Sequence, residues 1–261
     1  MVAGVTSMRY RIDIAFHGAG FHGWQKQPEC RTVQGEIELW LERLIGNGRP
    51  VPVTGAGRTD AGVHAAAMVA HFDSTLPVET ESLMHRLRVA LPHDMVVTGL
   101  HAVSNDFHAR YSAIARTYRY RIRLGRWPFE RDREWQIHDE LDPALLAACS
   151  QAVLGSHDFS GFCRAESRRE SNLCNVSCAE WTVDGSRLSF LIRADRFLHE
   201  MVRLIVGTTV AIARGHLRPD TIDEILSSGD VRLCGDAAPP HGLTLEAVDY
   251  PAEYSKPLDF N

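Results

Sequence analysis

Apolar and polar residues alternate from Met8 to Phe16, a pattern that is typical of a strand with one buried face. Downstream of Thr32, which suits a helix N-cap, apolar residues follow with helical spacing as far as Gly46. The same two patterns predict three more strands and a second helix, at 51–55, 67–73, 95–103 and 79–91. The first part of the chain therefore has the order β-α-β-β-α-β.

The second part repeats this order with different residues. An alternating strand is predicted at 112–124, and Asp142-Pro143 is typical of the start of a helix, which ends at Val153. Asp184-Gly185 is a strong signal for a β-hairpin. The remaining elements are the two hairpin strands, an apolar helix, a short inserted helix and a last strand, at 176–183, 188–194, 198–213, 219–227 and 243–248.

Two successive units of this order predict an α+β protein with two ferredoxin-like halves, residues 1–105 and residues 106–261. Each half would have a mostly antiparallel sheet with helices on one face. The connection at 104–111 looks too ordered for a linker, so we expect the two sheets to join around a central cleft.

With 44% hydrophobic and 23% charged residues, the 261-residue chain has the composition of an ordinary globular protein. No apolar run reaches the roughly 18 residues of a membrane span, and Met1 to Tyr10 lacks the pattern of a signal peptide. We therefore expect no membrane partner and a cytoplasmic location.

The six cysteines are scattered rather than set at the spacings of a disulfide framework, which indicates a reduced protein. Cys174 and Cys178, together with Cys163 and His157, would offer the ligands of a zinc site. A Cys-x3-Cys spacing alone is weak evidence for zinc, so we expect no metal.

A net charge of −5 excludes a protein that coats nucleic acid indiscriminately. Of the 28 basic residues, however, 26 are arginine, and eight arginines but only two acids lie from Arg110 to Arg133. This segment is either a solvated strand face or a local cationic groove. In the second case, the residues expected to contact phosphates are Arg58, Arg110, Arg119, Arg121 and Arg123.

The segment 55–65 (Gly-Ala-Gly-Arg-Thr-Asp-Ala-Gly-Val-His-Ala) presents a few chemical groups on a backbone with little side-chain bulk. It lacks the Lys-Ser/Thr of a Walker loop and the spacing of a dinucleotide-binding motif. Arg58 and Asp60 are two residues apart, so in an extended segment they project to the same side. The alternative is a hairpin in which Asp60 only bonds its own backbone.

Three other positions have two interpretations each. The aromatic and polar loop 21–27 suits contact with RNA or is an ordinary surface loop. Tyr118 is a core aromatic or a platform for a base. Arg203, in an apolar helix, needs a partner, which is Glu200 one turn earlier or Asp60 from the other half. Leu243 would lie at the mouth of the last strand.

Together these residues resemble the tRNA pseudouridine synthase A family over nearly the whole chain. The segment 55–65 is similar to the catalytic loop of that family. Six further motifs occur in the family's order, beginning at Phe21 (FHGWQxQ), Leu91 (LPxDMVV), Phe107 (FHARxSA), Arg116 (RxYxY), His157 (HDFS) and Phe197 (FLHxMVRxIVG). Two departures, Phe16-His17-Gly18 for the usual Tyr-Asp-Gly and a missing arginine at 171–176, concern RNA docking more than chemistry.

The resemblance implies an isomerase that converts uridine to pseudouridine at positions 38 to 40 of the tRNA anticodon stem and loop, without a cofactor. It implies that Asp60 is the nucleophile, which attacks either C6 of the uracil or C1′ of the ribose. Arg203 would pair with Asp60, and Arg58 would hold the flipped nucleotide. Tyr118, Leu243, Arg110 and His64 would bind the substrate. The family is homodimeric.

Two other classes of protein share part of this pattern. A non-catalytic RNA-binding protein would also use ferredoxin-like sheets, but it would not need Asp60 in a bare loop near two arginines. A retaining glycoside hydrolase needs two carboxylates about 5 Å apart, and this loop offers one.

Overall fold

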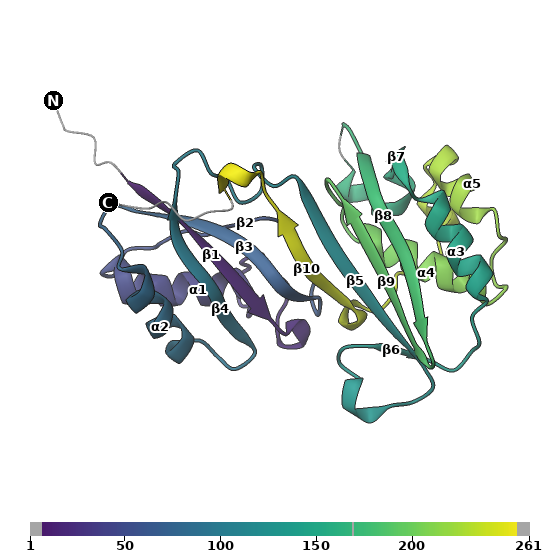
Figure 1. Cartoon of the computed structure of the whole chain (residues 1–261), viewed down its shortest axis with the longest axis horizontal. Helices are drawn as coiled ribbons and strands as arrows, with labels where there is room; N and C mark the ends of the chain where they lie inside the picture. The colour runs from purple at the N-terminus through teal and green to yellow at the C-terminus, as the bar shows by residue number, and fades with distance from the viewer. Residues whose placement is uncertain (1–6, 169, 255–261) are drawn as a thin grey trace. The chain divides into compact units, whose positions relative to one another are not determined.

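The computed structural model describes residues 7–168 and 170–254. Within this range the chain forms two compact units (Figure 1). The first comprises the chain up to Ile114 and again from Leu245, and the second comprises Ala115–Thr244. The fold is mixed α+β, and its strands pair mostly in antiparallel fashion. The last strand thus belongs largely to the first unit, whereas the sequence-based division assigned it to residues 106–261.

The first unit is built on β1 (Met8–Phe16), which lies between β3 (His64–Ser74) and β4 (Met95–Val103). The strand path is β4-β1-β3-β10 (β10 is Leu243–Asp249), and the two-residue strand β2 (Thr54–Gly55) also pairs with β3. Every second residue of β1 is buried, as the alternation predicts: Tyr10, Ile12, Ile14 and Phe16. The helices are α1 (Val33–Leu41), continued by a π-helical turn over Glu42–Gly46, and α2 (Thr80–Ala90).

The second unit has the antiparallel order β5-β9-β8-β7. These strands are β5 (Ala115–Leu124), β9 (Arg187–Ala194), β8 (Leu173–Asp184) and β7 (Gly155–Asp158). The short strand β6 (Trp135–Ile137) runs parallel to β5. The helices α3 (Pro143–Ala152), α4 (Met201–Ala213) and α5 (Thr221–Ser228) contact one another, and α3 also contacts β8 (Figure 1). The last strand, β10, spans Leu243–Asp249.

Three local differences from the predicted elements have physical causes. Residues 51–53 form no strand, because the backbone N–H and C=O of Val53 bond to the side chains of Glu38 and Gln34 at 3.1 and 3.0 Å. The helix predicted from residue 198 begins at Met201, since Glu200 has a left-handed backbone with φ of 60°. The strands β6 and β7 are too short to show an alternating pattern.

Candidate active site

The loop that carries Asp60 connects β2 to β3 and is fixed through its backbone. The N–H of Trp24 donates to the carbonyl of Thr59 at 3.1 Å, and the N–H of Gly62 donates to the carbonyl of Phe21 at 3.3 Å. Within the loop, the N–H of Val63 donates to the carbonyl of Asp60 at 3.1 Å. Hydrogen bonds therefore hold the chain on both sides of Asp60, whose own side chain is half-buried.

Two glycines allow the neighbouring segment to approach this loop closely. Gly23 has a φ of +85°, and a Cβ added to it would lie 2.5 Å from the carbonyl oxygen of Thr59. A Cβ at Gly18 would clash with the carbonyl oxygen of Val63. The supporting role of these glycines was not predicted. The signal was present, because a glycine inside an aromatic and polar motif often marks close backbone approach.

Neither of the two interpretations of the loop 21–27, contact with RNA or an ordinary surface loop, holds for its aromatic residues. Phe21 and Trp24 are only 3% and 2% exposed, so their rings are not available to bases. The ring of Trp24 instead packs against Gly55, where an added Cβ would lie 2.5 Å from it. This segment supports the Asp60 loop from the protein interior.

His64 is 4% exposed and begins β3. Its Nδ1 accepts a hydrogen bond from the backbone N–H of Gly18 at 2.9 Å, so the neutral ring carries its proton on Nε2. The ring centroid of His17 lies 4.4 Å from that of His64. These contacts make His64 a support of the loop, and its predicted contact with substrate remains a prediction.

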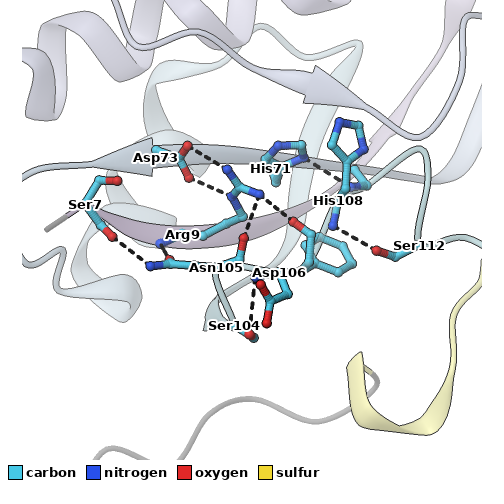
Figure 2. A network of polar contacts seen from close by, with 11 residues as sticks. Ser7, Arg9, His71, Asp73, Ser104, Asn105, Asp106, His108 and Ser112 are labelled. Atoms are coloured by element: carbon cyan, nitrogen blue, oxygen red, sulfur yellow. Dashed lines mark hydrogen bonds and ion pairs between the residues drawn. The ribbon is translucent and has the colours of Figure 1, made fainter.

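The segment that carries Arg110 is anchored by Arg9 of β1 (Figure 2). The guanidinium of Arg9 donates to the carbonyls of Asn105 and Phe107 at 2.9 and 2.8 Å, and to both carboxylate oxygens of Asp73 at 2.7 and 2.9 Å. The hydrogen bond from Arg9 lowers the pKa of Asp73 below its ordinary value. Arg110 itself is half-buried in a segment with a fixed backbone.

His71 of β3 completes this network (Figure 2). Its Nδ1 accepts a hydrogen bond from the N–H of Ala109 at 3.1 Å, and its ring lies 4.8 Å from that of His108. Burial, with the charges of Arg9 and His108 adding to it, lowers the pKa of His71 to about 4. The neutral ring is therefore the state that supports the backbone next to Arg110.

In the second unit, Tyr118 packs against Phe197 with ring centroids 5.1 Å apart and the rings nearly perpendicular. Tyr118 is half-buried, whereas Tyr120, two residues along the same strand, is fully buried. Tyr118 thus lies at the edge of the core rather than inside it. Leu243, at the start of β10, is 5% exposed.

Arg203 in α4 is held by two partners. Its Nη1 donates to Oε1 of Glu200 at 2.9 Å, and its Nε donates to the carbonyl of Ala238 at 2.8 Å. The other oxygen of Glu200 accepts from Nε of Arg164. Although burial alone would raise the pKa of Glu200, the hydrogen bond from Arg164 and the charges of both arginines lower it. The pair of Arg203 with Glu200 is confirmed, and a pair with Asp60 remains a prediction.

Two arginines of β5 are half-buried and bond to hydroxyl groups. Arg119 donates to Oγ of Ser189 at 3.0 Å, and Arg121 donates to Oγ1 of Thr244 at 3.1 Å. Arg123 was expected to contact phosphates with them, and this prediction is wrong. It is 9% exposed and forms an ion pair with the buried Glu134 at 2.6 Å. Arg58, in contrast, is exposed.

The cysteine positions considered for zinc are occupied by other interactions. An imidazole nitrogen of His157 bonds to the carbonyl of Leu154 at 2.7 Å. Burial raises the pKa of Cys174 to about 12, which disfavours the thiolate that zinc requires. Among residues 7–168 and 170–254, no cluster with the geometry of a metal site includes a cysteine, and no helix is long and apolar enough to cross a membrane.

Comparison with known proteins reveals close relatives over nearly the full length. The sequence pattern of a family described as tRNA pseudouridine synthase matches residues 149–251. The tRNA pseudouridine synthase A of Bacteroides thetaiotaomicron is 38% identical over 94% of this chain and 91% of its own. The enzyme of the same name from Listeria monocytogenes is 37% identical over 93% of this chain and 99% of its own. A chain of a Cbf5-Nop10-Gar1 complex aligns with a TM-score of 0.31, too low to bear on the fold.

Proposed function

Since the chain belongs to the tRNA pseudouridine synthase A family, we propose that it isomerises uridines of the tRNA anticodon stem and loop, with Asp60 as the nucleophile and no cofactor. The single observation that carries this assignment is the fixed backbone on both sides of Asp60. A nucleophile reacts efficiently only when it is held in attack geometry, and this loop provides that constraint.

The reaction exchanges one bond of the nucleoside for another. Asp60 attacks C6 of the uracil or C1′ of the ribose, and the bond from C1′ to N1 breaks. The uracil then rotates, C5 bonds to C1′, the proton on C5 leaves to water, and N1 takes up a proton in its place. Asp60 is released at the end, so that atoms and electrons balance without an oxidant or an energy source.

The other roles follow from the chemistry of each side chain. Arg203, fixed by Glu200 and Ala238, would present its planar guanidinium to Asp60. Exposed Arg58 would hold a phosphate of the flipped nucleotide. Tyr118, at the edge of the core, would stack on the uracil, and Leu243 would form the wall of its pocket. Arg110 would bind a phosphate. His64 would contact the substrate in addition to supporting the loop through its bond to Gly18.

The same proposal includes two ferredoxin-like halves, residues 1–105 and 106–261. The pairing of β4 with β1, of β1 with β3 and of β3 with β2 supports it for the first half, because a ferredoxin-like sheet has these pairings. In the second half, the helix α3 between β5 and the β8–β9 hairpin supports it. A homodimer in the cytoplasm is part of the proposal on the strength of the family resemblance, and the six free cysteines fit a reducing compartment.

The test uses tRNA that carries tritium at C5 of uridine. Isomerisation releases this tritium to water while the chain length and the number of bases stay the same. A binding protein releases none, and a hydrolase would shorten the RNA or free a base. Absence of tritium release with a mixture of tRNAs containing uridine at positions 38 to 40 would contradict the proposal.

A further inference from the structure

The connection between β5 and β6, residues 125–134, exposes two aromatic side chains that have no role in the function proposed above. Phe129 is 82% exposed and Trp127 is 44% exposed. Their rings meet edge to face, with centroids 5.5 Å apart. Exposed neighbouring aromatic rings on a soluble protein usually mark a binding surface.

The backbone of this connection is ordered by hydrogen bonds at its base. The N–H of Gly125 donates to the carbonyl of Ile137 at 2.7 Å. The N–H of Trp127 donates to Oε1 of Gln136 at 3.0 Å, and the side-chain amide of Gln136 donates back to the carbonyl of Trp127. At the C-terminal end of the connection, the N–H of Glu134 donates to the carbonyl of Glu130 at 2.9 Å. The two rings are therefore presented on a preformed loop.

A buried ion pair supports Trp127 from below. The guanidinium of Arg123 lies 5.4 Å from the centroid of the Trp127 ring and pairs with Glu134 at 2.6 Å. Arg187 of β9 reaches the other oxygen of Glu134 at 3.5 Å. A cation beneath an aromatic ring restricts its orientation and leaves the opposite face for another partner.

The charge around the rings is positive on a chain whose net charge is −5. Arg126, Arg131 and Arg133 are exposed in the same loop. Together with Arg123 and Arg187 they make five arginines against three carboxylates, those of Glu130, Asp132 and Glu134. Aromatic faces beside guanidinium groups are what unpaired bases and their phosphates require.

A second copy of the chain would fit this charge less well. A two-fold contact through the loop would bring the same arginines of both copies near one another, and that arrangement is repulsive.

We propose that Trp127 and Phe129, flanked by Arg126, Arg131 and Arg133, form a docking surface for unpaired nucleotides of the substrate RNA. The inference rests on the proposed function in taking tRNA as that RNA.

The experiment measures the affinity for full-length tRNA of the Asp60→Asn variant, which should be inactive under the proposed function, with and without Phe129→Ala and Trp127→Ala. Loss of one stacked base should weaken binding roughly 5- to 150-fold, which corresponds to the 1–3 kcal/mol of a base–aromatic stack. In the otherwise wild-type enzyme, KM should rise with little change in kcat. Phe129→Tyr should restore binding, and Val183→Ala, at an apolar residue of β8 that is 51% exposed, is the matched control.

Unchanged tRNA affinity in both alanine variants, with unfolding temperatures equal to that of the parent, would overturn the docking surface. Conversion of a dimer to a monomer by Phe129→Ala, measured by sedimentation, would assign the loop to a self-contact and overturn it as well. Because binding is measured without turnover, these outcomes test the docking surface and not the proposed isomerase activity. A chain that binds tRNA through the loop but releases no tritium would refute the activity alone.

Discussion

The Nη1 of Arg203 donates to Oε1 of Glu200 at 2.9 Å, which joins two residues at the N-terminal end of α4. The Nε of Arg203 also donates to the carbonyl of Ala238. The side chains of Arg203 and Glu200 are largely buried, with exposures of 13% and 8%. The orientation of the guanidinium is therefore set within the second unit. Any further group that contacts Arg203 therefore meets a guanidinium whose plane is already fixed.

The bonds of Arg203 predict different effects on kcat for the variants Arg203→Lys and Glu200→Gln. Arg203→Lys keeps the charge but loses the planar fork, so one amine cannot replace bonds to Glu200, Ala238 and a further group. We expect kcat to fall roughly 10- to 100-fold, as for loss of a charge-assisted hydrogen bond. Glu200→Gln should cost less kcat, because the amide oxygen still accepts from Arg203 and only the hydrogen bond from Arg164 is lost. Equal losses of kcat in the two variants would show that Arg203 acts only within its helix and does not pair with Asp60.

Gly23→Ala should disturb the Asp60 loop directly. The new Cβ would lie 2.5 Å from the carbonyl of Thr59, and the φ of +85° is strained for alanine. We expect kcat to fall more than tRNA affinity, together with a lower unfolding temperature. Gly48→Ala is the matched control, because Gly48 has a similar φ of +78° but no atom within 4 Å of an added Cβ. If kcat falls equally in both variants, the close approach of Gly23 to the Asp60 loop is not important for catalysis.

Stability should fall as the solution is acidified from about pH 6.5 to about pH 4. Burial lowers the pKa of His71 to about 4 from an ordinary value of 6.5, so the unfolded chain binds a proton before the folded chain does. The full loss from this group is roughly 3 kcal/mol. His71→Asn keeps an acceptor for Ala109 but cannot titrate, so chemical unfolding at several pH values should show a weaker dependence. His85→Asn, on the exposed face of α2, is the control, and an equal pH dependence in wild type and His71→Asn would contradict the assignment.

The salt dependence of tRNA binding tests whether Arg119 and Arg121 of β5 contact phosphates. If Arg119 or Arg121 contacts a phosphate, its replacement by Gln should make the slope of log affinity against log salt shallower by about 0.7 to 0.9. Arg58→Gln should instead lower kcat, since its proposed work is on the flipped nucleotide. Unchanged slopes for both Arg119→Gln and Arg121→Gln would show that this strand does not carry the RNA.

Arg123→Gln should behave differently from its neighbours. It leaves Glu134 buried without its close partner, which typically costs about 3–5 kcal/mol of stability. The midpoint of thermal unfolding should therefore drop, while the salt slope stays the same. If Arg123→Gln instead has normal stability and a shallower slope of log tRNA affinity against log salt, Arg123 contacts the RNA.

Long regular patterns in the sequence predicted the elements that depend on them. The alternation in β1 and the Asp184-Gly185 turn between β8 and β9 appear as predicted, and Gly185 has a φ of +56°. Side-chain direction was harder to predict where a distant residue decides it. Arg123 follows the polar positions of its strand, yet Glu134, eleven residues later, buries it. Phe21 and Trp24 face inward where Gly18 and Gly23 permit close packing against the Asp60 loop, and the glycines of the motif were the one local signal of it.

The role of Asp60 is tested most directly by Asp60→Asn, an isosteric change that removes the nucleophile but keeps the loop. Tritium release from C5-labelled tRNA should fall to the background rate, while the affinity for tRNA stays nearly the same. Multiple turnover by Asp60→Asn protein, shown by mass spectrometry to be free of wild-type enzyme, would contradict the assignment of Asp60 as the nucleophile.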